Sequence, residues 1–286
     1  MSHSTNKQLR EDLLREEVAT SYATGALLQN LAEVRGRVRP LGRSFVTLAY
    51  AQSLDGSITT ERGQRYRLSG PEAMRFTHAL RATHDAILVG VGTVLADDPE
   101  LRVRLVEGPD PQPIVVDSRL RTPATAKLLA RTGRPLWIAT VPSAAGACEG
   151  ERRAGGDSRE RGSADDDVRR SRISHIEAHG GRIVTCPALP SGWVDLAGLL
   201  RQLAAEGVAH VMVEGGARII ASLIAARLVD YLIVTVVPQL LGGLPAFAPP
   251  ARRPAGLGAV SHVERWVSAR LGDDLVLGGE ISWPAP

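Results

Sequence analysis

Four stretches of the chain combine glycine turns with charged side chains. They are AQSLDG at 51–56, RYRLSGPEA at 65–73, VGVGTVLADDP at 89–99 and VEGGA at 213–217. Glycine lets a ligand approach the backbone closely, and the free N–H groups at a helix N-terminus bind phosphate. Several arginines lie near these stretches, and a guanidinium group binds phosphate in a bidentate way. The pattern predicts a site for a phosphorylated ligand, with the VEGGA turn holding a nucleotide diphosphate.

Each stretch has a simpler interpretation when it is taken alone. Gly90 and Gly92 form a lone G-x-G that lacks the third glycine and the acidic residue of the dinucleotide fingerprint. Asp98 and Pro99 are also a common turn pair. In an arginine-rich chain, most arginines are solvated. The combination and order of the four stretches, rather than any one of them, favour a binding site.

The segment 208–243 predicts one strand–helix–strand unit that places the VEGGA turn. His210 to Val213 is a short apolar run typical of a strand buried on both faces, and Tyr231 to Val237 is a second, β-branched strand. The residues from Ala217 to Arg227 have a helical pattern. In an open α/β sheet, ligands bind beyond the carboxyl ends of the strands. Glu214 lies just past such an end.

Further strands and helices alternate along the chain, which predicts an α/β fold with a mostly parallel sheet. A proline at the first helical position predicts a helix from about Ser69 to His84, and Asp195 is expected to cap a helix ending at Gly207. The last strand, at 274–281, is expected near an edge. Other strands are predicted at 45–51, at 113–118, at 135–140 and at 182–187, and the segment 86–99 predicts a buried strand that ends in a glycine-containing loop and a short turn.

Composition limits the class of protein. The chain has 286 residues, a formal net charge of +3 and 44% hydrophobic residues, which suits one large domain, or one domain with appendages. No apolar run is long enough to cross a membrane, the charged N-terminus does not resemble a signal peptide, and the two cysteines fit no metal-ligand spacing. We therefore expect a cytoplasmic protein without a metal. Aromatic and basic residues do not interleave as in single-strand binders, so no nucleic-acid partner is expected.

Two segments differ from the rest of the chain. Residues 1–43 carry apolar residues at helical spacing, interrupted near Gly25, and predict a helical extension that packs on the main domain or on a partner subunit. Residues 144–172 are rich in Gly, Ser, Arg and Asp, and predict a disordered insertion. The expected organisation is an extension at 1–43 followed by one domain at 44–286.

The four stretches, in this order and spacing, resemble the riboflavin-biosynthesis pyrimidine reductases, and stand-alone fungal and archaeal members more than bifunctional ones. TVLADDP followed by Leu101 and Arg104, and VEGGA followed by LVD and QLLGG, carry the resemblance from Phe45 to Ile281. It implies a dihydrofolate-reductase-like fold, NADPH as cofactor and a homodimer. It also implies reduction of the ribosyl group of a phosphoribosylamino-pyrimidine to a ribityl chain.

The resemblance also implies roles for individual residues. Glu214 would hydrogen-bond the pyrimidine or assist proton transfer, and its simpler interpretation is a structural carboxylate tied to local N–H groups. Arg119, by our own inference, would favour a 2′-phosphate. The substrate contacts would be Arg65, Arg81, Leu101, Arg104 and Glu214. The NADPH contacts would be Ala51, Arg67, Thr93, Asp97, Ser118, Gly215, Gly216, Ala217 and Arg218.

The chain departs from the bacterial pattern at the substrate end. Ala49 stands where bifunctional members often carry lysine, Arg67 where many have tryptophan, and Arg65 where a small polar residue is usual. The substrate is therefore open between the deaminated and the 2,5-diamino pyrimidine. A redirected reductase acting on a pterin, dihydrofolate or specialised metabolite, and an inactive NADPH-binding partner protein, are the alternatives. No H-x-E with a following P-C-x-x-C is present, so no deaminase half is expected.

Overall fold

A computed structural model describes residues 2–37, 41–61, 63–64, 66–130, 133–142, 158–246 and 261–283, with side chains from 19 in the first segment and from 166 in the sixth. Its strands are β1 (Phe45–Ser53), β2 (Ser57–Thr59), β3 (Ala86–Gly90), β4 (Gln112–Val116), β5 (Trp137–Thr140), β6 (Arg182–Thr185), β7 (His210–Val213), β8 (Tyr231–Val237), β9 (Leu244–Pro245), β10 (His262–Leu271) and β11 (Asp274–Ser282). Its helices are α1 (Ser2–Arg37), α2 (Pro71–Ala82), α3 (Val91–Asp97), α4 (Lys127–Ala130), α5 (Ser158–Ala178), α6 (Leu196–Ala205) and α7 (Ala217–Ala225).

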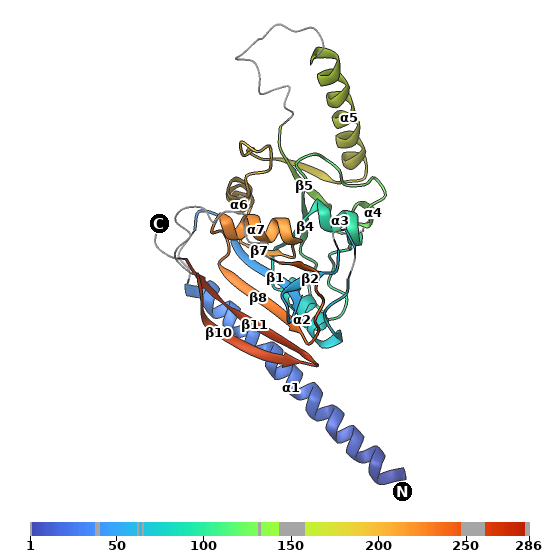
Figure 1. The fold of residues 1–286 in the computed structure, drawn as a ribbon, viewed down its shortest axis with the longest axis vertical. Coiled ribbons are helices and arrows are strands. Elements are labelled where there is room, and N and C mark those ends of the chain that lie inside the picture. The colour runs from blue at the N-terminus through green and yellow to red at the C-terminus, as the bar shows by residue number, and fades with distance from the viewer. Residues whose placement is uncertain are drawn as a thin grey trace.

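A nine-stranded sheet in the order β10-β11-β8-β1-β7-β3-β4-β5-β6 forms the centre of the fold (Figure 1). All neighbouring strands from β8 to β6 run parallel, and only β11 runs against its neighbours. The predicted α/β class with a mostly parallel sheet is confirmed. Because the strands are parallel, the ends of β1, β3, β4, β7 and β8 that carry the polar turns meet at one edge.

Helices cover both faces of the sheet because the central strands are apolar on both sides. On one face, α6 and α7 pack on alternate residues of the strands, such as Leu48 and Leu88. On the other face, α1 and α2 pack on Phe45, while α3, α4 and α5 pack on Ile87 and its neighbours. The sheet is therefore the middle of three layers, and its strands have little freedom to shift the turns at their ends.

The N-terminal extension is one continuous helix, α1, that passes through Gly25 without the predicted interruption. Its C-terminal half packs on the main domain, where Leu27, Leu31 and Val34 are fully buried. Arg35 donates a hydrogen bond to the carbonyl oxygen of Thr83 at the end of α2. The N-terminal half projects beyond the sheet (Figure 1). A single glycine in a long helix costs only about 1 kcal/mol relative to alanine, which packing of the next two turns offsets.

The structure describes only part of the segment 144–172, which was predicted to be a disordered insertion. Its first half lies outside the described residues, whereas its second half belongs to α5, which runs from Ser158 to Ala178. Ile176 at the C-terminal end of α5 is buried against the β3–β5 face, and Arg172 donates to the carbonyl oxygen of Leu120. Composition suggested disorder because the segment has few apolar residues, but its C-terminal turns are held by tertiary contacts that composition does not reveal.

The C-terminal strand β11 is not at the edge of the sheet. It lies between β8 and β10, and β10 forms the edge. The strand β10 was not predicted, because most of its residues are exposed and they form no continuous apolar run. The strand β10 is held in the sheet by its antiparallel pairing with β11 rather than by an apolar pattern of its own side chains.

The SLDG turn and the QLLGG loop are joined by the carboxylate of Asp55. This carboxylate accepts hydrogen bonds from the hydroxyls of Ser53 and Ser57, at 2.6 and 2.7 Å, and from the backbone N–H groups of Leu241 and Gly242, at 2.8 and 2.9 Å. These bonds, the Ser53 hydroxyl first, hold the pKa of Asp55 well below its usual range. The two-stranded sheet of β2 and β9 is thereby fixed beside the end of β1.

Candidate active site

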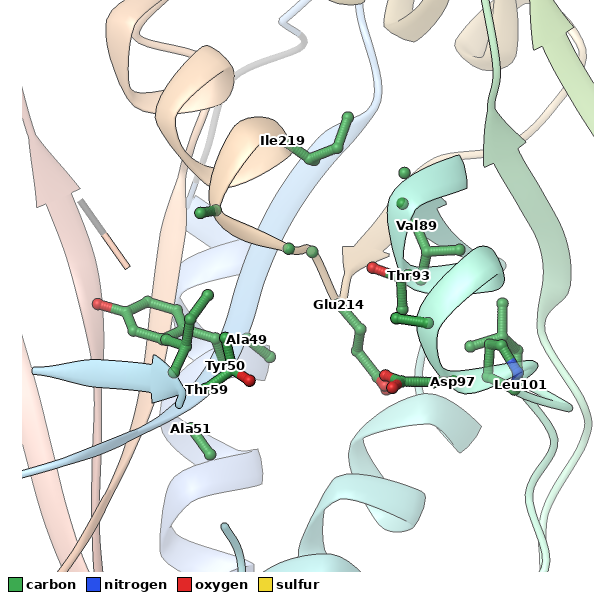
Figure 2. A pocket seen from close by; sticks show the side chains of 18 of the residues that line it. Ala49, Tyr50, Ala51, Thr59, Val89, Thr93, Asp97, Leu101, Glu214 and Ile219 are labelled. Carbon is green, nitrogen blue, oxygen red and sulfur yellow. The ribbon is translucent and has the colours of Figure 1, made fainter. Parts of the chain in front are cut away.

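A cleft of about 1060 Å³ opens at the carboxyl ends of β1, β3, β4, β7 and β8. Figure 2 shows Glu214 pointing into this cleft, with Ala49, Tyr50 and Ala51 of β1 on one side and Thr93 and Asp97 of α3 on the other. Every predicted site residue except Arg65 and Arg119 lines this one cleft, and Arg119 is described but is not among its lining residues. Arg65 lies outside the described residues. The sequence stretches that were read separately therefore form a single site.

The wall formed by β7, α7, β3 and α3 is built around glycines. Both helices begin at a glycine, Gly90 for α3 and Gly216 for α7, and neither has a side-chain cap. A Cβ atom at Gly216 would lie 3.5 Å from the hydroxyl of Thr93, and one at Gly90 would lie 2.7 Å from Cγ1 of Ile219. A side chain at Gly216 would crowd Thr93, and a side chain at Gly90 would push α7 away from β3. The residues of the first turn of α7, from Ala217 to Ile219, line the cleft.

The Gly90→Ala substitution tests this close packing. We expect a loss of about 1–3 kcal/mol in unfolding free energy, because the new methyl group overlaps Ile219 in a packed wall. The double variant Gly90→Ala/Ile219→Ala removes the overlapping atoms, so its loss should be smaller than the sum of the two single losses. Urea denaturation of the four proteins measures this coupling. Gly92→Ala is the matched control, since a Cβ atom there meets nothing within 4 Å. Additive losses would contradict the close packing.

Glu214 and Arg81 form a buried ion pair at the base of the cleft. The guanidinium Nε of Arg81 donates to Oε1 of Glu214 at 2.6 Å and Nη2 donates to Oε2 at 2.7 Å, while Nη1 donates to the carbonyl oxygen of Arg102 at 2.9 Å. The side chains are 10% and 21% exposed. Burial opposes the charge on Arg81, but the carboxylate of Glu214 outweighs it and raises the pKa of Arg81. Glu214 is therefore held by a side chain rather than by local N–H groups.

Arg81 is a predicted substrate contact that also pairs with Glu214. The resemblance implied a direct contact of Arg81 with substrate, and Arg81 does line the cleft. In this structure, Nε and Nη2 of Arg81 donate to Glu214 and Nη1 donates to the carbonyl oxygen of Arg102. A guanidinium has five N–H donors, so Arg81 keeps two for a ligand, and its contact with substrate stays a prediction. The side chain of Arg104 is the more exposed of the two, at 54%.

Arg104 is positioned through its backbone. Its N–H group donates to Nδ1 of His78 at 2.9 Å, and its guanidinium approaches Glu100 at 3.2 Å. Burial, together with the charges of Arg81 and Arg104, lowers the pKa of His78 to about 4. His78 is thus neutral near pH 7 and accepts the bond from Arg104. Leu101, in the same loop as Arg104, is 3% exposed. Its backbone has φ 51°, a left-handed conformation that is uncommon for leucine.

The remaining predicted cofactor contacts differ in accessibility. Ser118 is 6% exposed, and its hydroxyl accepts a hydrogen bond from the N–H group of Val194 at 3.1 Å. Arg67 and Arg218 are exposed, and Ala51 is half-buried at the end of β1. Asp97 ends α3 and faces the cleft (Figure 2). Ser118 therefore fixes a neighbouring loop as well as lining the cleft.

Sequence reasoning missed many of the residues that line the cleft, and three examples carry large aromatic or charged side chains. Trp193 lies against the side chains of Arg119 and Arg218, Tyr66 donates to the side-chain oxygen of Gln239 at 3.2 Å, and Lys127 approaches Asp98 at 3.5 Å. Trp193 lies in the SGW loop just before Asp195, which caps α6. A large aromatic residue beside a helix start is the sequence feature that could have indicated Trp193 as a site residue. Tyr66 and Lys127 had no local pattern to distinguish them from surface residues.

The fold and the cleft define a class of protein: an α/β protein with a cleft, lined by several arginines, beyond the ends of parallel strands. Among the described residues, no group of three or more His, Cys, Asp or Glu side chains could hold a metal, and no described helix is long and apolar enough to cross a membrane. The model of the RibD C-terminal domain matches residues 44–251. The chain belongs to this family, the pyrimidine reductases of riboflavin biosynthesis.

Individual relatives agree with this assignment. The chain is 34% identical to the 2,5-diamino-6-ribosylamino-4(3H)-pyrimidinone 5′-phosphate reductase of Archaeoglobus fulgidus over 70% of this chain and 83% of that protein. The enzyme of the same name from Debaryomyces hansenii is also 34% identical, over 70% of this chain and 77% of that protein. The solved structure of the riboflavin biosynthesis reductase Rib7 of Saccharomyces cerevisiae superposes with a TM-score of 0.63 at 27% identity, covering 90% of this chain and 98% of that one. The predicted likeness to stand-alone archaeal and fungal reductases is confirmed.

Proposed function

We propose that this protein reduces the ribosyl group of a 5-phosphoribosylamino-pyrimidine to the ribityl chain, with NADPH as the reductant. One observation carries the proposal: the stretches expected to bind cofactor and those expected to bind substrate line a single cleft. They do so in a chain that is 34% identical to reductases named for such a pyrimidine phosphate. Because those relatives act on the 2,5-diamino form, we favour it over the deaminated form.

The cleft fits NADPH at the glycine wall. Gly215, Gly216, Ala217 and the start of α7 offer backbone N–H groups for the diphosphate. No Cβ atom occupies the space at Gly92, where a substituent would meet nothing within 4 Å. Thr93 and Asp97, on the facing helix α3, would contact the same ligand, with Ala51 and Arg67 on the opposite wall. When bound, NADPH would supply the hydride, and the protein's task is to position donor and acceptor.

The Arg81–Glu214 pair suits the electrostatics of the reaction. The reducible form of the sugar is the opened chain, whose C1 carbon is an imine that becomes more electrophilic when it carries positive charge. An ionised carboxylate next to that carbon stabilises such a charge and accepts hydrogen bonds from pyrimidine N–H groups. Because both carboxylate oxygens of Glu214 accept hydrogen bonds from Arg81, we propose that Glu214 acts through its charge rather than as a proton donor.

Turnover with defined substrates tests the proposed function. Purified protein is mixed with NADPH and either the deaminated or the 2,5-diamino phosphoribosylamino-pyrimidine, and the absorbance of the reduced nicotinamide is followed. We expect oxidation with the diamino form. Oxidation with dihydrofolate alone would instead support a redirected reductase, and tight NADPH binding without turnover on any compound would support an inactive binding protein. Either result would reject the proposal.

Arg104→Ala tests the substrate end of the cleft. We expect the KM for the phosphorylated pyrimidine to rise about 10- to 100-fold, because a charged hydrogen-bond partner of the phosphate is lost. The KM for NADPH should change by less than about twofold. Arg102→Ala is the matched control, since Arg102 lies two residues away, pairs with Asp110 and does not line the cleft. An equal rise in both KM values for Arg104→Ala would contradict its assignment to substrate phosphate.

We also propose that the protein is a cytoplasmic homodimer, as the family resemblance implies. Sedimentation equilibrium of the full chain tests the dimer, and a single species with the mass of one chain would reject it.

A further inference from the structure

The imidazole ring of His78, on α2, uses only one of its two nitrogens within the protein. Its Nδ1 accepts a hydrogen bond from the backbone N–H group of Arg104 at 2.9 Å, and among the described residues this is the only hydrogen bond of the ring. His78 is 2% exposed and lines the cleft. The ring is thus part of the cleft wall and not of the outer surface.

The bond from Arg104 decides which nitrogen of His78 carries the proton. A nitrogen that accepts from an N–H group is not itself protonated, so in the neutral ring the proton lies on Nε2. Burial, followed by the charges of Arg81 and Arg104, lowers the pKa of His78 to about 4, and the ring is therefore neutral near pH 7. Nε2 is an N–H donor that has no acceptor in the part of the chain that the structure describes.

This donor is open to the cleft. Among the described residues, the fully enclosed side-chain nitrogens and oxygens that lack a partner belong to Arg35 and Asp117, so Nε2 of His78 is not enclosed. His84, the other buried imidazole beside α2, shows the contrast. Its Nδ1 lies 2.7 Å from the carbonyl oxygen of Leu80, its Nε2 lies 2.8 Å from the hydroxyl of Thr47, and it does not line the cleft. A nearly buried donor that faces a binding cleft is normally met by water or by a ligand.

His78 lies between the two ends of the proposed substrate site. It holds the backbone of Arg104, which we assign to the substrate phosphate, and it is three residues before Arg81, which pairs with Glu214. Residues three apart share one face of a helix. In a phosphoribosylamino-pyrimidine, a carbon chain with hydroxyl groups joins the phosphate to the C1 carbon that accepts hydride. A neutral N–H group between these ends suits a hydroxyl oxygen, because it adds no full charge beside the reacting carbon.

We propose that His78 is a substrate-binding residue, whose Nε2 donates to a hydroxyl oxygen of the opened sugar chain while its Nδ1 holds Arg104 beside the phosphate. The inference deepens the proposed function and rests on it, since it requires the cleft to bind the phosphorylated sugar. Because one ring makes both contacts, it fixes the spacing between the phosphate and the sugar chain.

Two amide variants separate the roles of the two nitrogens. In His78→Asn, the side-chain oxygen can replace Nδ1 as the acceptor for Arg104, but no donor reaches the position of Nε2. In His78→Gln, the terminal NH2 group can replace Nε2, but the acceptor for Arg104 is lost. We expect His78→Asn to raise the KM for the 2,5-diamino substrate about 5- to 10-fold and to change the KM for NADPH by less than about twofold.

The Arg104→Ala background distinguishes the sugar contact from the placement of Arg104. In that background, His78→Asn should still raise the substrate KM by about the same factor, because its effect does not pass through Arg104. The effect of His78→Gln should largely disappear there. His84→Asn is the matched control, and it should lower stability without changing the substrate KM, because His84 lies outside the cleft. A substrate KM in His78→Asn within about twofold of wild type would overturn the sugar contact.

Nitrogen-15 NMR of wild-type protein labelled at histidine tests the inference without a variant. In the free protein, Nε2 of His78 should carry the proton and Nδ1 should be unprotonated. Saturating ribitylamino product should shift the Nε2 resonance and leave Nδ1 unprotonated. A proton on Nδ1, or an Nε2 resonance that does not respond to bound product, would overturn the contact while the proposed function stands. If wild-type protein neither binds nor turns over the pyrimidine, the proposed function fails and the contact fails with it.

Discussion

The Arg81→Met variant is expected to lose about 3–5 kcal/mol of unfolding free energy, because it leaves the carboxylate of Glu214 in a largely buried site without its cation. Arg81 also donates to the carbonyl oxygen of Arg102, so the loop that carries Arg104 should loosen as well. Urea denaturation followed by circular dichroism measures the loss, and the midpoint should shift without a large change in slope.

Arg182→Met provides the matched control for this result. Arg182 makes the same two-bond contact with Glu206, but its side chain is 48% exposed. An exposed ion pair contributes about 0–1 kcal/mol, so this variant should stay close to wild type. The double variant Arg81→Met/Glu214→Leu should recover much of the loss, because neither buried charge remains. A loss in Arg81→Met no larger than that in Arg182→Met would show that the buried pair does not organise the site.

Gly243→Ala is expected to have the second large effect. A Cβ atom at Gly243 would lie 2.0 Å from the carbonyl oxygen of Thr59 and 2.8 Å from Cα of Thr60. Both are backbone atoms, so no side-chain rotation relieves the overlap, and β2 and β9 must separate. Because β2 and β9 supply Thr59 and Leu244 to the wall of the cleft, substrate binding should weaken together with stability. We expect a stability loss of about 3 kcal/mol, at the upper end for an added methyl group.

Hydrogen exchange locates this loss. The amides of 57–60 and 241–246 should exchange faster in Gly243→Ala, while those of the central strands should keep their protection, since β2 and β9 form a sheet of their own. Gly36→Ala is the control, because a Cβ atom at Gly36 meets nothing within 4 Å. Unchanged exchange in both β2 and β9 would contradict the close contact between Gly243 and Thr59.

The sequence by itself determined the parts of the fold that depend on neighbouring residues. Apolar runs indicated β1, β3, β4, β5, β7 and β8, because a strand buried on both faces needs continuous apolar residues. Pro71 at the start of α2 and Asp195 at the start of α6 marked helix ends, since capping is decided within a few residues. The glycine stretches located the cleft because the ends of parallel strands meet at one edge.

The tertiary structure alone decided which of these residues act on each other. Arg81 and Glu214 are 133 positions apart, and only the placement of α2 beneath the end of β7 makes them a pair. The same holds for Trp193 with Arg119 and Arg218, and for β10, whose order comes from pairing with β11 rather than from its own residues. Periodicity and capping report local preference, whereas ion pairs, ring contacts and edge pairing depend on distances that the packed sheet sets.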